Sequence, residues 1–173
     1  MGASHEDHDA RSETSATSIT TVLTPASDSS SADESGFRYR PLSHDHTFLI
    51  IERLSGKAVT YAPDGRLALQ DVVEANRSAI QWLCVEKAGY LGLQNTKSGR
   101  YIGHNGNGLM QASATRFNGW EFITTRDQPG GGYKILVPHW FTLRTVVVSE
   151  DGKSLIARDH GNTLWDFIQI SKE

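Results

Sequence analysis

From residue 46 onward, apolar and polar residues alternate over short runs, and turn-forming residues interrupt these runs. Alternation with a period of two predicts β-strands, and no useful window shows the 3.6-residue period of an amphipathic helix. Glycine occurs with Pro, Asn or Asp between the runs, at 63–65, 105–108, 129–132 and 151–152, as expected of tight turns. The pattern predicts twelve strands, at residues 48–51, 57–61, 66–69, 80–85, 90–93, 101–103, 109–112, 120–124, 134–137, 145–148, 154–157 and 164–170.

One sequence pattern occurs three times, with a spacing of 43 or 44 residues. Each copy contains a basic residue and a glycine eight positions later: Lys57 and Gly65, Arg100 and Gly108, Arg144 and Gly152. Each copy closes on a tryptophan with an apolar or thiol side chain two residues further on: Trp82 and Cys84, Trp120 and Phe122, Trp165 and Phe167. A fixed period indicates a copied supersecondary unit that buries its apolar face against its neighbours. We therefore expect the three tryptophans to occupy equivalent core positions.

Four strands per copy are typical of the propeller and of the β-trefoil. A propeller needs about four or more blades, whereas three copies of four strands suit a six-stranded barrel capped by three hairpins. We therefore predict an all-β fold, a β-trefoil over residues 37–173, with repeats at about 46–88, 89–131 and 132–171. The run at 36–42 is expected to pack across the barrel; a basic and aromatic contact segment is the alternative.

Residues 1–36 have a different composition, with 14 Ser or Thr, seven acidic residues, one basic residue and no aromatic residue. This composition predicts a disordered acidic tail and leaves a charge of about +3 on the remainder. That charge is too small to predict a nucleic-acid partner. The sequence shows neither a secretory signal nor an apolar run of the roughly 20 residues that cross a bilayer. We expect no membrane partner, and a cytoplasmic or nuclear location.

The second copy carries a more specific pattern, which reads Gly99-Arg100-Tyr101-Ile102-Gly103, then Gly108, Ala112-Ser113-Ala114 and Trp120-Glu121-Phe122. On these residues the chain resembles the fascin-type repeat of the actin-crosslinking superfamily, and it is similar to small lectin-like fungal β-trefoil proteins. It resembles ricin-type lectins less, because their repeat ends in Gln-x-Trp and Gln81 here directly precedes Trp82. The resemblance implies the β-trefoil fold. Through the fascins it also implies actin binding, although cross-linking by fascins uses several trefoils and this chain has one.

Two turns combine short polar side chains with glycine, a composition that can hydrogen-bond sugar hydroxyls beside an aromatic ring. The candidate ligand-binding residues are His104, Asn105, Asn107, Asp159, His160 and Asn162, with Trp140 as the ring. Tyr61 and Tyr101 are alternative rings. Asn, Asp and Gly are also ordinary turn formers, and the histidines could be exposed loop residues. A purely structural role for these turns therefore stays open.

The sequence shows no established catalytic motif. Its histidines occur at most in pairs, whereas a metal site needs three or four converging ligands, so we predict no metal and no cofactor. Cys84 lies within an apolar strand and is expected to be a buried thiol. The leading hypothesis is a non-enzymatic binding module that recognises a carbohydrate or a protein through its loops. The alternatives are an accessory enzyme that uses His104, His139, His160 and Asp159, an actin-binding module, or a protease-inhibitor module.

Overall fold

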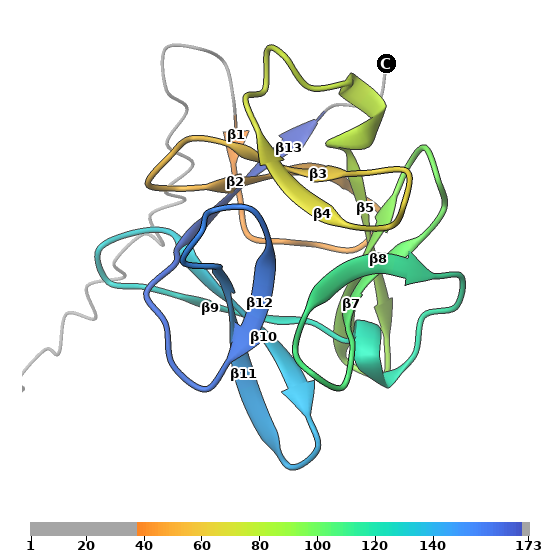
Figure 1. The fold of residues 1–173 in the computed structure, drawn as a ribbon, viewed down its shortest axis with the longest axis vertical. Coiled ribbons are helices and arrows are strands. Elements are labelled where there is room, and N and C mark those ends of the chain that lie inside the picture. Colours follow the sequence, from red (N-terminus) through yellow and green to blue (C-terminus); the bar gives the residue numbers. More distant parts are fainter. Residues whose placement is uncertain (1–37, 171–173) are drawn as a thin grey trace, which may run out of the picture.

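A computed structural model describes residues 38–170. These residues form three consecutive four-stranded units, preceded by the short strand β1 (Arg38–Tyr39) (Figure 1). The first unit contains β2 (Thr47–Glu52), β3 (Ala58–Tyr61), β4 (Leu67–Gln70), the 3-10 turn η1 (Arg77–Ala79) and β5 (Trp82–Lys87). The second contains β6 (Tyr90–Asn95), β7 (Tyr101–His104), β8 (Met110–Ala114), η2 (Gly119–Glu121) and β9 (Thr124–Asp127). The third contains β10 (Tyr133–His139), β11 (Thr142–Val148), β12 (Leu155–Arg158) and β13 (Trp165–Ile170).

Six of these strands close a barrel. The antiparallel pairs β13–β2, β2–β5, β5–β6, β9–β10 and β10–β13 follow one another around it. The bridge between Leu91 and Ile123 completes the ring between the second unit's first and last strands. The hairpins β3–β4, β7–β8 and β11–β12 gather at one end of the barrel. This arrangement confirms the predicted β-trefoil with three four-stranded repeats.

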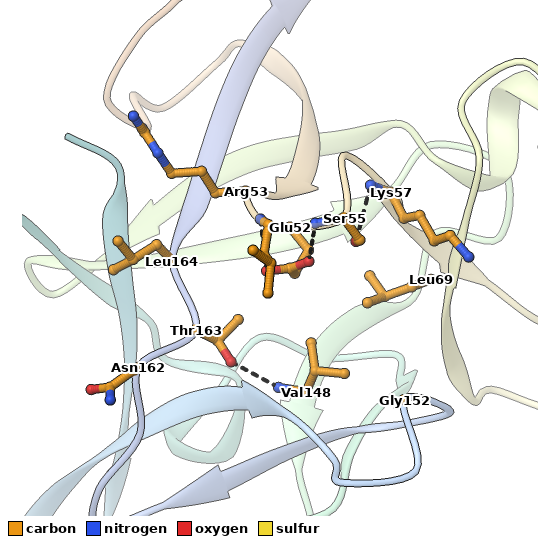
Figure 2. A pocket seen from close by; sticks show the side chains of 11 residues that line it. Glu52, Arg53, Ser55, Lys57, Leu69, Val148, Gly152, Asn162, Thr163 and Leu164 are labelled. Atoms are coloured by element: carbon orange, nitrogen blue, oxygen red, sulfur yellow. Dashed lines mark hydrogen bonds between the residues drawn. The ribbon is translucent and has the colours of Figure 1, made fainter. Parts of the chain in front are cut away.

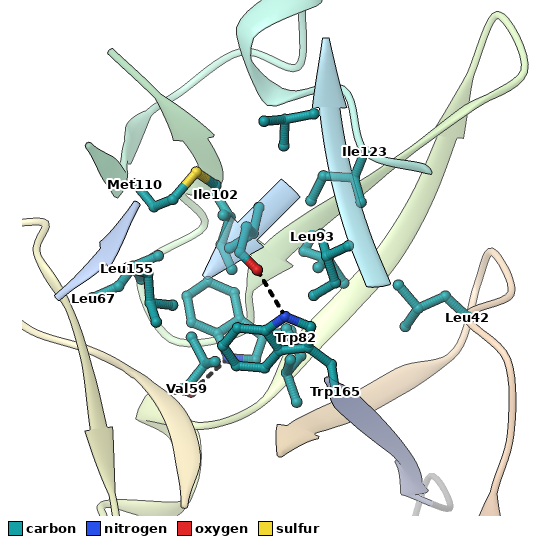
Figure 3. Close-up of a cluster of buried hydrophobic side chains, with 14 of the residues drawn as sticks. Leu42, Val59, Leu67, Trp82, Leu93, Ile102, Met110, Ile123, Leu155 and Trp165 are labelled. Carbon is teal, nitrogen blue, oxygen red and sulfur yellow. Dashed lines mark hydrogen bonds between the residues drawn. The ribbon is translucent and has the colours of Figure 1, made fainter. Parts of the chain in front are cut away.

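Two of the three repeated tryptophans are core residues, as predicted. The side chains of Trp82 and Trp165 are fully buried. The Nε1–H group of Trp82 donates to the carbonyl oxygen of Val59 at 2.9 Å, and that of Trp165 donates to Val146 at 3.1 Å (Figure 3). Each indole thereby ties a barrel strand to the hairpin of its own repeat. Because a buried indole N–H needs a partner, the repeated pattern specifies this bond as well as apolar volume.

The prediction that Trp120 is the third core tryptophan is wrong. The last strand of each repeat pairs with its first strand through Trp82 and Phe48, Ile123 and Leu91, and Trp165 and Tyr133. Ile123 therefore occupies the equivalent position, and its exposed fraction is 1%. Trp120 lies three residues earlier in η2, which replaces the start of the predicted strand at 120–124, and 39% of it is exposed.

The entry segment packs on the barrel, as one of the two predictions for it stated. Arg38 and Tyr39 pair with Gln169 and Ile168 of β13, and Leu42 is buried in the main core cluster. Gly36, Phe37 and the predicted tail at 1–36 lie outside the described residues. Within residues 38–170, no helix is both long and apolar enough to cross a bilayer.

Cys84 is a buried thiol, as predicted, and belongs to the main core cluster. Burial raises its pKa to about 12, and the negative charges of Glu86 and Asp45 act in the same direction. The thiolate is the reactive form of cysteine, and the raised pKa keeps Cys84 in the thiol form. Its role is therefore to pack in the core.

Candidate functional site

Aromatic side chains from the second and third repeats meet on the surface of the molecule. The ring centroids of Trp120 and Trp140 are 5.9 Å apart in an edge-to-face arrangement, and those of His104 and Trp120 are 4.7 Å apart. Trp140 is 77% exposed, and its neighbour Phe141 is fully exposed. We call Trp120, Trp140 and Phe141 the aromatic surface. Exposed large aromatic groups that gather in this way usually mark an interaction site.

The aromatic surface depends on a hairpin that is longer in the third repeat. In the first two repeats the strands part at Glu52 and Asn95, whose side chains cap the following loops. Glu52 accepts from the Ser55 N–H at 2.7 Å, and Asn95 accepts from the Ser98 N–H at 3.1 Å. Val137 stands at the equivalent position, opposite Arg144. A valine side chain cannot accept these bonds, and the ladder instead continues to the pair His139 and Thr142.

Trp140 occupies an unusual backbone conformation at the tip of this hairpin. Its φ angle is +54°, in the left-handed region that costs an L-residue roughly 1–2 kcal/mol. Glycine is the common residue where a two-residue hairpin turn needs a positive φ. The chain therefore places a large aromatic residue at a strained position where most of its surface is exposed to water.

The turn η2 brings Trp120 to the same surface. Gly103 of β7 permits this approach, because a Cβ atom there would lie 2.9 Å from the carbonyl oxygen of Trp120. The carboxylate of Glu121 accepts a hydrogen bond from the Asn118 N–H at 3.0 Å and so closes the turn. Burial raises the pKa of Glu121, although hydrogen bonds from backbone N–H groups act in the opposite direction.

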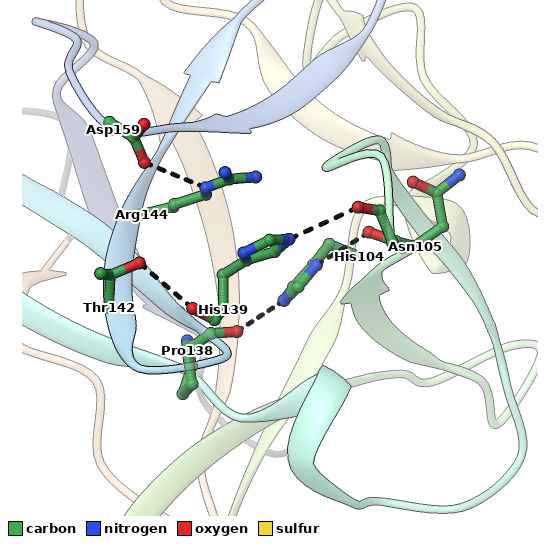
Figure 4. A network of polar contacts seen from close by, with 8 residues as sticks. His104, Asn105, Pro138, His139, Thr142, Arg144 and Asp159 are labelled. Carbon is green, nitrogen blue, oxygen red and sulfur yellow. Dashed lines mark hydrogen bonds and ion pairs between the residues drawn. The ribbon is translucent and has the colours of Figure 1, made fainter.

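Two buried histidines join the second repeat to the long hairpin beneath the aromatic surface (Figure 4). The His104 ring donates from Nε2 to the carbonyl oxygen of Pro138 at 2.7 Å, and its Nδ1 lies 3.0 Å from the carbonyl oxygen of Asn105. His139 approaches the carbonyl oxygen of Gly106 through Nε2 at 3.4 Å. Their exposed fractions are 4% and 8%. Neither is an exposed loop histidine, and both hold the turn at 105–108 against the hairpin.

Polar groups flank the histidines on this side of the molecule. Arg144 donates from Nε to Asp159 Oδ1 at 3.0 Å, and the Asp159 side chain is 66% exposed. The side-chain oxygen of Asn105 accepts from the N–H groups of Asn107 and Leu109 at 3.0 and 2.9 Å. Asn105 therefore performs the turn-forming role that the sequence left open. Asn107 is exposed, and no hydrogen bond of its side chain occurs within the described residues.

The predicted site residues are only partly brought together. His104, Asn105 and Asp159 belong to the network of Figure 4, and Trp140 contacts it through His139, with ring centroids 6.2 Å apart. Asn162 instead lines a hollow between the first and third repeats (Figure 2). His160 is exposed, and no hydrogen bond or ring contact connects it to the aromatic surface in the described part of the chain.

Sequence reasoning missed three residues of this site, Trp120, Phe141 and Arg144, and nothing in the repeat pattern marks Phe141. Trp120 was assigned to the core because its spacing imitates that of Trp82 and Trp165, although Gly119 before it indicated a turn. Arg144 was treated only as a repeat marker, although its aspartate partner follows fifteen residues later. No group of three or more His, Cys, Asp or Glu side chains suited to a metal ion occurs among residues 38–170.

No protein-family model matches this sequence, and no curated protein sequence matches it either. Solved structures do. A ricin B-like lectin from Macrolepiota procera, determined in complex with lactose, has a TM-score of 0.62 and 16% identity, over 74% of this chain and 98% of that one. A GlcNAcα1-4Gal-releasing endo-β-galactosidase from Clostridium perfringens has a TM-score of 0.65 and 16% identity, over 73% of this chain.

The chain spans about a third of the endo-β-galactosidase, since 33% of that chain is covered. At this identity the likenesses concern the fold alone. The resemblance to fascin-type repeats stays a prediction. The likeness to the ricin B-like lectin agrees with the β-trefoil fold of this chain.

Proposed function

We propose that this protein is a non-enzymatic carbohydrate-binding module and that the aromatic surface is its glycan-binding site. The observation that carries the proposal is Trp140, a bulky aromatic residue with a positive φ that is 77% exposed at a hairpin tip. Strained conformations of this kind persist where function uses them. The face of an indole ring stacks on the apolar C–H surface of a sugar, and Trp120 fixes that ring from the side at 5.9 Å.

In this proposal, polar groups of the neighbouring second-repeat turn and of the third repeat supply the hydrogen bonds that a sugar requires. The exposed Asp159 carboxylate has one oxygen engaged by Arg144, and its second oxygen is available to accept from a sugar hydroxyl. The exposed Asn107 side chain adds a donor and an acceptor. His104 and His139 are assigned a positioning role, because both are buried and face backbone carbonyl oxygens.

The structure neighbours support the same class of ligand. The Macrolepiota lectin was determined in complex with lactose, and the Clostridium enzyme is a GlcNAcα1-4Gal-releasing endo-β-galactosidase. Both are carbohydrate-active proteins with trefoil regions similar to this chain. Lactose is therefore the first soluble probe to test.

A glycan array with the full chain tests the proposal, followed by calorimetric titration of lactose and of each array ligand. We expect binding by the wild-type protein and a loss of at least about tenfold in affinity for Trp140→Ala, because an aromatic anchor of this size carries about 1.4 kcal/mol or more. Val73→Ala is the control, since Val73 is an exposed apolar residue of the first repeat that lines neither the aromatic surface nor the hollow. The proposal would be contradicted if the folded protein bound no glycan on the array, or if Trp140→Ala and wild type bound with equal affinity.

Protein binding is the second candidate function. The observation in its favour is Phe141, whose ring is fully exposed beside Trp140 and the 46%-exposed Leu143. Exposed aromatic and apolar side chains of this kind are typical anchors of a protein–protein interface. Filamentous actin is the partner that the fascin resemblance implies. Co-sedimentation with actin that Phe141→Ser abolishes and Trp140→Ala also weakens would favour this function over glycan binding.

The accessory-enzyme alternative gains no support from the geometry of its residues. His104 and His139 face backbone carbonyl oxygens, and Asp159 is paired with Arg144.

A further inference from the structure

The His104 ring lies between two backbone carbonyl oxygens that belong to different repeats. Its Nε2 atom is 2.7 Å from the carbonyl oxygen of Pro138 in β10, and its Nδ1 atom is 3.0 Å from that of Asn105 (Figure 4). A neutral imidazole carries one N–H donor and one nitrogen lone pair, whereas a protonated ring donates from both nitrogens. The protonated ring therefore makes a hydrogen bond in both contacts, and the neutral ring makes a hydrogen bond in one.

The two contacts of His104 differ in length, which indicates the bond that a neutral ring keeps. The distance of 2.7 Å to Pro138 is at the short end for an N–H···O bond, as expected when the donor is charged. We assign the single N–H group of the neutral ring to Nε2, because this nitrogen makes the shorter contact. The lone pair of Nδ1 would then face the carbonyl oxygen of Asn105, and two acceptors at 3.0 Å repel each other.

A buried carboxylate lies close enough to offset a positive charge on His104. The ring is 4% exposed, so water cannot solvate the charge and fixed partners must do so. Glu121 of η2 is buried, and a Cβ atom on Gly103, the residue before His104, would lie 3.0 Å from Glu121 Oε1. Burial raises the pKa of Glu121, whereas backbone hydrogen bonds and the positive charge of His104 act in the opposite direction.

His139 and an ion pair are the other ionisable groups that approach this ring from the third repeat. The ring centroids of His104 and His139 are 5.5 Å apart, so two protonated rings would repel each other. His139 faces one carbonyl oxygen, that of Gly106 at 3.4 Å, and its neutral form can donate to it. Arg144 is paired with Asp159, and β8, which pairs with β7, carries no ionisable side chain. The proton therefore belongs on His104, the ring with two acceptors.

The two carbonyl oxygens around His104 belong to the two parts of the proposed glycan site. Asn105 begins the turn at 105–108, and its side-chain oxygen accepts from the N–H group of Asn107, one of the polar groups assigned to sugar binding. Pro138 lies two residues before Trp140, the aromatic ring assigned to the same site. A ring that donates to both oxygens fixes the turn relative to the hairpin.

We propose that His104 is a proton-dependent positioning residue, whose protonation orders the glycan site and strengthens glycan binding as pH falls. This inference rests on the proposed function. The sign follows from the donors: the ordered site holds the extra proton in a second hydrogen bond, so by linkage a ligand that prefers the ordered site takes up a proton on binding. Imidazole side chains change their charge between about pH 5 and 8, which sets the range to measure.

Two measurements on the full chain test the proposal. Long-range ¹H–¹⁵N NMR of the ligand-free protein, from about pH 8 to pH 5, reads the charge of the His104 ring. The backbone amide shifts of Gly106 and Asn107 report the turn in the same samples. We expect the ring to gain a proton as pH falls and both amide shifts to follow it with the same midpoint. Calorimetric titration of lactose should give an affinity at least about fivefold higher near pH 5.5 than near pH 7.5.

Three variants assign the pH dependence to one ring. His104→Gln can donate to Pro138 but cannot change its charge, so its lactose affinity should vary little with pH. His160→Gln is the matched control, because His160 is exposed and lies outside the histidine network, and it should keep the wild-type profile. His139→Gln should also keep the pH dependence. If His104→Gln does not fold, the ring and amide spectra of the wild-type protein still decide the question.

Four results would overturn the proposal. The His104 ring could stay neutral down to about pH 5, or it could titrate while the Gly106 and Asn107 amides and the lactose affinity stay constant. The pH dependence could persist in His104→Gln or disappear in His139→Gln, which would assign it to another group. Failure of the proposed function is a separate outcome: no glycan would bind at any pH, whereas the ring and amide shifts would still show whether the proton of His104 orders the turn.

Discussion

At the scale of single residues, Trp140 combines an unfavourable backbone conformation with a side chain that gains little from burial. A residue kept for stability would adopt the opposite combination. Gly103 contributes through the absence of a side chain, which lets η2 approach β7 and places Trp120 beside His104. The local chemistry of the aromatic surface is therefore set by one residue that is larger than its turn favours and one that is as small as possible.

Substitution of Trp140 separates strain from recognition. Trp140→Ala removes the ring but keeps the free-energy cost of the left-handed backbone conformation, whereas Trp140→Gly removes both the ring and that cost. We expect Trp140→Gly to be more stable than Trp140→Ala by about 1 kcal/mol, the reverse of the usual order of these residues. Both variants should lose glycan binding. Urea denaturation with matched m-values measures the difference, and an alanine variant of equal or higher stability would contradict the strain at this position.

Glu121 makes stability depend on pH with a definite sign. Burial raises its pKa above the unfolded value, so the folded state binds a proton more tightly than the unfolded state. Its contribution to the free energy of unfolding is favourable at low pH and is lost as pH rises from about 4.5 through the folded pKa. Glu121→Gln should flatten this part of the stability profile. An unchanged slope between wild type and variant in chemical denaturation at several pH values would refute the assignment.

At the scale of elements, η2 decides which residue of the second repeat enters the core. The turn moves Trp120 outward and leaves Ile123 in the position that Trp82 and Trp165 fill in the other repeats. The long β10–β11 hairpin has a similar origin, because Val137 replaces the capping side chains of Glu52 and Asn95. Both departures from symmetry contribute to the aromatic surface.

The exchange of roles between Trp120 and Ile123 predicts opposite phenotypes. Ile123→Ala should cost about 2–5 kcal/mol of unfolding free energy, because it leaves a cavity in a core that cannot collapse fully. Trp120→Ala should cost about 1 kcal/mol, since it removes mainly edge-to-face ring contacts, and it should weaken glycan binding. Thermal unfolding of both variants distinguishes the assignments. A larger loss of unfolding free energy for Trp120→Ala than for Ile123→Ala would indicate that Trp120 is the core residue.

At the scale of the whole molecule, the trefoil is a symmetric scaffold with two local departures. The aromatic surface arises where the second and third repeats meet, and the hollow that Asn162 lines lies where the third and first repeats meet. Backbone hydrogen bonds join the first hairpin to the second, from Ala112 N–H to Gly65 O, and the second to the third, from Ala157 N–H to Gly108 O. The three junctions between repeats therefore differ in structure.

Two glycines provide a matched test of this asymmetry. Gly108 and Gly152 have similar positive φ angles of +83° and +69°, but only Gly108 contacts a neighbouring strand. Gly152→Ala should cost about 1 kcal/mol for its φ alone. Gly108→Ala should cost about 2 kcal/mol or more, because its Cβ would also clash with the carbonyl oxygen of Ala157. Equal losses of unfolding free energy in denaturant would indicate that the surroundings of Gly108 and Gly152 are equally packed.

The residue pattern by itself determined the all-β class, the threefold repeat, eleven of the twelve predicted strand positions, and the core roles of Trp82, Trp165 and Cys84. These features depend on local alternation, turn chemistry and a fixed period, all of which are properties of neighbouring residues. The exposure of Trp120, the burial of His104 and His139, the pairing of Arg144 with Asp159 and the hollow between the first and third repeats were decided only by the tertiary structure. Each depends on how residues from different repeats approach one another, and a one-dimensional period carries no information about departures from symmetry in three dimensions.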